Sequence, residues 1–121
     1  MADKIRNFRD LEVWQLGKKI VMAVYQGTRN FPTDERFGLT SQMRRAAVSI
    51  PSNIAEGFNR FGNKEYRQFL HIALGSCAEL ETQIELGCEL GFLKQETAAE
   101  LLEKLDFESR MLRNLVKRLT S

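Results

Sequence analysis

The stretch Leu39–Phe61, LTSQMRRAAVSIPSNIAEGFNRF, carries the strongest helical pattern in the chain. Its large apolar residues follow one another at steps of three and four, which places them on one face of an α-helix. These residues are Leu39, Met43, Ala46, Ala47, Ile50, Ile54, Phe58 and Phe61. The stretch therefore predicts a long amphipathic helix with one face in a hydrophobic core.

A second row of residues in the same stretch forms a polar stripe. It consists of Gln42, Arg45, Ser49, Ser52 and Glu56. The residues around it are small, which lets another backbone approach closely, and buried polar groups there need partners. We expect this helix to contact protein on more than one side. Its predicted companion is the helix Leu70–Leu90, whose Glu79 or Glu81 would form a buried ion pair with Arg44 or Arg45.

Pro51 lies well inside this helical pattern. A proline at an interior position removes one backbone donor and clashes with the carbonyl group four residues earlier, at a cost of ~3 kcal/mol. Because the apolar period continues without a slip on both sides of Pro51, the sequence predicts one kinked helix rather than two short ones.

Three other segments have helical spacing, and they begin near Asp10, Asn63 and Gln95. Four amphipathic helices with short connections predict an all-α fold, an antiparallel up-down four-helix bundle with a single domain over residues 1–121. Candidate N-caps are Asp10, Thr40 or Ser41, and Asn63. Gly91 followed by Phe92 is typical of a glycine C-cap. Gly17, inside the first helix, indicates a close helix contact or local fraying.

The composition is that of an ordinary globular protein, with 43% apolar and 28% charged residues. The net charge of +2 excludes a strong whole-molecule field, so binding of nucleic acid would require local clustering of charge. The longest apolar run near the N-terminus, Ile20–Tyr25, is too short to span a bilayer, and no signal-peptide pattern precedes it. We therefore expect a cytoplasmic protein with no membrane role.

The residue types that carry chemistry are sparse. His71 is the one histidine, and no cysteine pair lies close enough to complete a metal site with it. Cys77 and Cys88 would lie ~16 Å apart on one helix, beyond disulfide reach, so we expect buried, reduced thiols. Glu79 and Glu81 diverge by about 200° on a helix and cannot share a substrate. No phosphate loop or nucleophile elbow occurs. We expect no enzyme activity, metal, cofactor or small-molecule substrate.

Basic residues cluster near both ends of the chain. The cluster, which we call the terminal basic surface, contains Lys4, Arg6, Arg9, Arg110, Arg113, Lys117 and Arg118. In an up-down bundle with an even number of helices, both chain ends lie at the same end of the bundle, so these side chains should converge there. Such local charge is what phosphate binding requires. The alternative is that the late basic residues only complement the helix dipole and form a solvated face.

The run GLTSQMRRAAVSIPSNIAEG (38–57) resembles the central motif of the four-helix-bundle family encoded in intervening sequences of bacterial 23S ribosomal RNA genes. The likeness continues in FRDLEVWQ (8–15), FPTDERFGL (31–39), EYRQFLHIALGSCAELETQ (65–83) and MLRNLVKRL (111–119), and so covers nearly the whole chain. The resemblance implies a four-helix bundle that assembles into a homopentamer. Related accessory proteins of diversity-generating retroelements are also pentameric bundles and bind nucleic acid.

The resemblance thus implies RNA binding as a first function, with no contact residue transferable from the motif. The matching polar positions have structural spacing: Gln42, Arg44, Arg45, Asn53, Glu56, Glu79 and Glu81. The alternative is a homo-oligomeric protein-interaction scaffold with no nucleic-acid role. Nucleic acid retained at low salt and released at high salt would distinguish the two functions.

Overall fold

The computed structural model describes residues 5–120, which form four α-helices and no strand. The helices are α1 (Glu12–Gly27), α2 (Leu39–Phe58), α3 (Asn63–Glu89) and α4 (Gln95–Leu119). Two single-turn 3-10 helices, η1 (Phe8–Asp10) and η2 (Thr33–Glu35), precede α1 and α2. The predicted all-α four-helix fold is confirmed.

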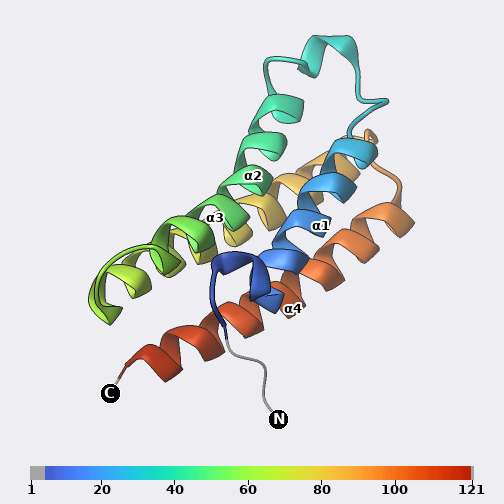
Figure 1. The fold of residues 1–121 in the computed structure, drawn as a ribbon. Helices are drawn as coiled ribbons and strands as arrows, with labels where there is room; N and C mark the ends of the chain where they lie inside the picture. Colours follow the sequence, from blue (N-terminus) through green and yellow to red (C-terminus); the bar gives the residue numbers. More distant parts are fainter. Residues whose placement is uncertain (1–4, 121) are drawn as a thin grey trace.

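Successive helices run in opposite directions, so the chain passes up and down a bundle (Figure 1). Each helix packs against two others: α1 and α3 both contact α2 and α4. The described part of the N-terminal segment lies beside the carboxyl-terminal part of α4, and the connection between α1 and α2 lies at the opposite end of the bundle (Figure 1).

The core contains apolar residues from all four helices, and its largest fully buried side chains include Ile20, Ile50, Leu80 and Leu105. The predicted apolar stripe of α2 is buried from Met43 to Ile54. Phe61 is the exception, because α2 ends at Phe58 and leaves the Phe61 side chain 96% exposed. The helix continues through Pro51 without interruption, as predicted, while the kink stays a prediction.

Two of the predicted N-caps are wrong because an extra 3-10 turn precedes each helix. The Asp10 carboxylate accepts hydrogen bonds from the backbone N–H groups of Arg6 (3.0 Å) and Asn7 (3.2 Å), so it completes a capping box of η1, whose N-cap is Asn7, and does not cap α1. These two bonds lower the pKa of Asp10. At α2, the N–H of Leu39 donates to Oε1 of Glu35 at 3.0 Å, and the N-cap position is Gly38.

Of the remaining two predicted caps, the N-cap at Asn63 is wrong and the glycine C-cap at Gly91 is confirmed. Asn63 is the first residue of α3, with Gly62 at the N-cap, so Asn63 does not cap the helix. Gly91 ends α3 as predicted: its φ of 82° is in the left-handed region, and the N–H of Phe92 donates to the carbonyl oxygen of Gly87 at 2.9 Å.

One acidic side chain lies in the middle of the core. Glu108 of α4 is 0% exposed, and neither of its carboxylate oxygens has a hydrogen-bond partner in residues 5–120. It lies where α1 and α2 also meet, because a Cβ atom on Gly17 would be 3.1 Å from Oε2 of Glu108 and 3.3 Å from Cβ of Pro51. Burial raises the pKa of Glu108 to about 8. Gly17 therefore marks a close helix contact.

The substitution Gly17→Ala should lower the free energy of unfolding by ~1–2 kcal/mol, because the new methyl group overpacks the contact with Glu108 and Pro51. This loss should exceed the ~1 kcal/mol that alanine gains over glycine in helix propensity. Gly75 of α3 is the matched control, since a Cβ there meets nothing within 4 Å. Gly75→Ala should be stabilising in the same urea titration. Equal effects at the two positions would contradict the close contact.

The raised pKa of Glu108 predicts a pH dependence of stability. The native carboxyl holds its proton up to about pH 8, whereas the unfolded carboxyl releases it near 4.5. The contribution of Glu108 to the free energy of unfolding should therefore be largest below about pH 5 and fall between about pH 5 and pH 8, by up to ~1.4 kcal/mol per pH unit. Glu108→Gln, which cannot ionise, should flatten this slope in denaturant titrations across the range. An identical slope in both proteins would rule out the Glu108 origin.

Candidate nucleic-acid interface

The terminal basic surface is built from both ends of the chain. Lys117 and Arg118 of α4 line a hollow of about 990 Å³ together with Ile5 and Asp10 of the N-terminal segment. Arg6 and Arg9 are exposed in the same segment. Lys4 lies outside the described residues. An even number of helices requires the N-terminal segment to lie at the same end of the bundle as the end of α4, and residues from both line this hollow.

Part of the positive charge of this surface is neutralised. Arg110 forms an exposed ion pair with Asp106 at 2.8 Å. Asp10 and Glu12 line the hollow beside Lys117. Arg113 and Lys117, by contrast, are exposed and have no carboxylate within 4.0 Å in residues 5–120. Arg6, Arg9 and Arg118 share this property within residues 5–120, so five exposed cations of this surface are available to a phosphate group.

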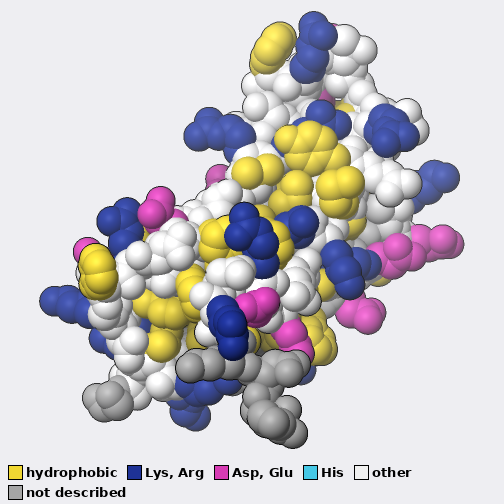
Figure 2. All heavy atoms as spheres, viewed as in Figure 1, with side chains coloured by type: hydrophobic (Ala, Val, Ile, Leu, Met, Phe, Trp, Pro, Cys, Tyr) yellow, Lys and Arg dark blue, Asp and Glu magenta, His cyan; other side chains and the backbone are white. Residues whose placement is uncertain are grey.

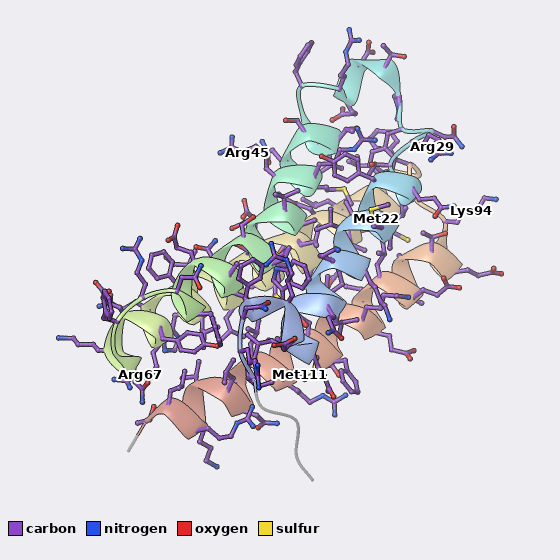
Figure 3. The ribbon with its side chains drawn as sticks, viewed as in Figure 1. Met22, Arg29, Arg45, Arg67, Lys94 and Met111 are labelled. Carbon is purple, nitrogen blue, oxygen red and sulfur yellow. The ribbon has the colours of Figure 1, made fainter. Side chains whose placement is uncertain are left out.

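Arg67, which the sequence reasoning did not single out, joins α3 to α4 at this end. Its Nη1 donates to the carbonyl oxygen of Leu119 at 2.7 Å, and Figure 3 shows it near the end of α4. A cation at the carboxyl end of a helix satisfies the last carbonyl groups and complements the dipole. The signal in the sequence was a basic residue early in α3, which the up-down topology brings beside the end of α4.

The predicted ion pair between α2 and α3 is wrong. Arg44 extends toward α1 instead: its Nε donates to Oγ1 of Thr28 at 3.0 Å, and its guanidinium lies 4.5 Å from the centre of the Tyr25 ring. Neither Glu79 nor Glu81 forms an ion pair in residues 5–120, where the only two such pairs are Arg60–Glu56 and Arg110–Asp106.

A neutral hydrogen bond joins α2 and α3 in place of that pair, and a second one within α2 supports it. The hydroxyl of Ser76 donates to Oγ of Ser49 at 2.8 Å, and Nδ2 of Asn53 donates to the same oxygen at 2.9 Å. Gln42, Arg45 and Glu79 line a hollow of about 400 Å³ on the surface above this contact. Arg45 is exposed and extends away from the bundle (Figure 3).

The remaining candidates for chemistry lie apart from one another. His71 is exposed, and the free cysteines are Cys77, which is buried, and Cys88, which is half-buried. Burial is the main cause that raises the pKa of the Cys77 thiol to about 12. Residues 5–120 contain no group of three or more side chains that would hold a metal ion. No helix among these residues is long and apolar enough to cross a membrane.

Comparison with known proteins gives the family. The model of the 23S rRNA-intervening sequence protein family matches residues 9–114. The chain belongs to this family. A crystal structure of a protein with unknown function from the S23 ribosomal protein family of Bacteroides thetaiotaomicron VPI-5482 superposes with a TM-score of 0.78, covering 87% of this chain and 98% of that chain. At 20% identity, this likeness shows the fold of the intervening-sequence protein. No curated protein matches the sequence.

The contacts of Arg44 predict different costs for the two neighbouring arginines. Arg44→Ala should lower the free energy of unfolding by ~1–2 kcal/mol, because it removes a hydrogen bond to a buried hydroxyl and a cation–π contact. Arg45→Ala, at an exposed position, should change it by less than ~0.5 kcal/mol. Chemical denaturation of both variants provides the measurement. Equal costs would mean that the contacts of Arg44 with α1 contribute nothing.

Proposed function

We propose that this intervening-sequence protein is a non-enzymatic, cytoplasmic homo-oligomer that binds RNA through the terminal basic surface. The observation that supports this most strongly is the position of Lys117 and Arg118 beside the N-terminal segment, in one hollow of the surface. Residues separated by most of the chain thereby meet in a single region, and the exposed Arg6 and Arg9 belong to the same N-terminal segment. In Figure 2, dark-blue lysine and arginine side chains lie at this end of the molecule as well as over the rest of the visible face.

The low net charge is compatible with this proposal because phosphate contacts are local. A charge of +2 gives little attraction at long range. At physiological ionic strength, the Debye length of about 8 Å limits each exposed cation to its neighbourhood. Contacts with phosphates carry no sequence information, so little preference among RNA sequences is expected. Affinity should instead fall steeply with salt, as counterions are released from the RNA.

Self-association would multiply these weak contacts. Several large apolar side chains are exposed in the single chain, including Phe61 (96%), Phe37 (87%) and Met22 (69%). Exposed apolar groups of this size are typical of interaction surfaces. In the homopentamer that the family resemblance implies, the terminal basic surface would be repeated five times around a closed ring. Binding at several copies then raises the overall affinity through effective concentration.

The same exposed aromatic groups favour a second candidate function, a protein-interaction scaffold. A ring that presents Phe37 and Phe61 would bind a partner protein through apolar contacts and would need no phosphate. The scaffold predicts binding that is insensitive to salt, whereas RNA binding through Arg113 and Lys117 is lost as salt increases.

The test measures binding of a fluorescein-labelled, single-stranded RNA of mixed sequence by fluorescence anisotropy over a range of salt concentrations. The double variant Arg113→Glu/Lys117→Glu should weaken binding by about tenfold or more and reduce the slope of log affinity against log salt by about one to two. Lys18→Glu/Lys19→Glu, which makes the same change of charge on α1, should have a much smaller effect.

Light scattering of each protein establishes that the oligomer is intact during this comparison. A monomer of the unaltered chain at micromolar concentration would refute self-association. An intact ring that binds no RNA at low salt would refute RNA binding and favour the scaffold. Equal losses in both double variants would mean that RNA responds to overall charge, which would exclude a specific role for the terminal basic surface.

A further inference from the structure

A second cationic surface lies at the opposite end of the bundle, between α1 and α2. It is a groove of about 590 Å³, which we call the α1–α2 groove. The lining residues that matter for the argument are Tyr25, Arg36, Thr40, Ser41, Arg44 and Arg45. Figure 2 shows dark-blue side chains around an apolar strip in this upper part of the molecule. Arg36 comes from the connection before α2, so three separate elements contribute to the groove.

The three arginines lack acidic partners. No carboxylate lies within 4.0 Å of Arg36, Arg44 or Arg45 in the part of the chain that the structure describes, and no acidic residue lines the groove. The nearest acids have other surroundings: Glu35 accepts from the N–H of Leu39, and Glu79 faces Arg45 across the neighbouring hollow. Three guanidinium groups around one groove without a carboxylate favour an anion.

One of these arginines is held in a fixed orientation. The bond from Nε of Arg44 to Oγ1 of Thr28 and the contact with the Tyr25 ring fix two sides of the guanidinium. Thr28 is itself buried and donates to the carbonyl oxygen of Val24 at 2.8 Å. Nη1 of Arg44 has no hydrogen-bond partner in residues 5–120. A donor that is already oriented loses less side-chain entropy when it binds a ligand.

A buried hydroxyl supplies an independent indication of a ligand. Thr40 is only 8% exposed, yet its Oγ1 has no hydrogen-bond partner among residues 5–120. A buried polar atom without a partner is rare and costly in folded proteins. Thr40 lines the groove, so a small movement of the side chains that cover its Oγ1 would let an acceptor bound there reach this hydroxyl. The N–H groups of Thr40 and Ser41, in the first turn of α2, have no acceptor within the helix.

We propose that the α1–α2 groove is a binding site for a phosphate group, held by Arg36, Arg44 and Arg45 and oriented by the hydroxyl of Thr40. A tetrahedral phosphate offers several acceptor oxygens, which matches donors that come both from α2 and from the connection before it. Free phosphate, a mononucleotide and an RNA strand all carry this group. The site is separate from the terminal basic surface and does not depend on it.

The experiment titrates the full-length chain with inorganic phosphate, AMP and the labelled RNA in separate low-salt measurements, by calorimetry for the first two and anisotropy for the third. Saturable binding of phosphate or AMP would identify a small ligand, and saturable binding of RNA alone would identify a phosphodiester. Either result supports the site only when it responds to the groove variants. Absence of saturable binding of all three ligands at millimolar concentration overturns the proposal.

The variant Arg36→Ala/Arg45→Ala removes two exposed groove cations and leaves the structural contacts of Arg44 intact. It should weaken binding by about tenfold or more. Arg29→Ala is the matched control, since Arg29 is exposed near the same end but does not line the groove, and it should change affinity less than about twofold (Figure 3). Unchanged binding in the double variant, or an equal loss in Arg29→Ala, overturns the site.

Thr40→Val tests the hydroxyl without changing charge. It should weaken phosphate binding while leaving thermal stability equal or higher, because the lost hydroxyl has no partner in the unliganded protein. Arg113→Glu/Lys117→Glu should bind inorganic phosphate normally, which separates failure of the groove from failure of the terminal basic surface. Dissociation of the oligomer in Arg36→Ala/Arg45→Ala, seen by light scattering, would overturn the proposal and assign the groove to acidic side chains of a second copy.

Discussion

The close approach of Gly17, Pro51 and Glu108 sets the distance between α1, α2 and α4. Gly17 has no side chain, so the proline ring and the carboxyl group of Glu108 occupy the space beside it. Pro51 has no N–H group, which leaves the carbonyl of Ala47 without its usual helical donor. The bundle thus places polar atoms at the centre of an apolar core. The desolvation cost of Glu108 stays moderate because, with a pKa of about 8, its carboxyl group is protonated and neutral below that pH.

The polar contact between α2 and α3 is also uncharged. The hydroxyl of Ser76 on α3 donates to Oγ of Ser49 on α2, and the amide of Asn53 donates to the same oxygen from within α2. A neutral contact avoids the desolvation cost that a buried ion pair would carry. Arginines next to this contact on α2 therefore remain outside the core. The guanidinium of Arg45 is exposed to solvent and forms no ion pair in residues 5–120, so it is available to an anionic ligand.

The sequence predicted the helices well because their apolar spacing is determined by the core that each must cover. It predicted the helix starts poorly. Asp10 and Glu35 accept backbone N–H bonds beside short 3-10 turns, and such turns have no apolar periodicity that a sequence pattern could reveal. The partner of Arg44 was missed because spacing does not say which neighbouring helix a long side chain reaches. Glu108 left a signal that spacing alone can detect, as it continues the row of Leu101, Leu105 and Leu112. The number of helices predicts that the N-terminal segment meets the end of α4. The α1–α2 groove could not be predicted in this way, because Arg36 comes from an irregular connection.

The two cationic surfaces act independently because of the length of the bundle. Along α1, Val13 beside the terminal basic surface and Tyr25 in the α1–α2 groove are 12 residues apart, which corresponds to ~18 Å. That distance is about twice the Debye length of about 8 Å at physiological ionic strength, so charge at one surface is largely screened at the other. A small phosphate ligand would occupy the α1–α2 groove without any effect on the terminal basic surface. Only a ligand that extends along the whole bundle, such as a nucleic-acid strand, would combine the affinities of both ends.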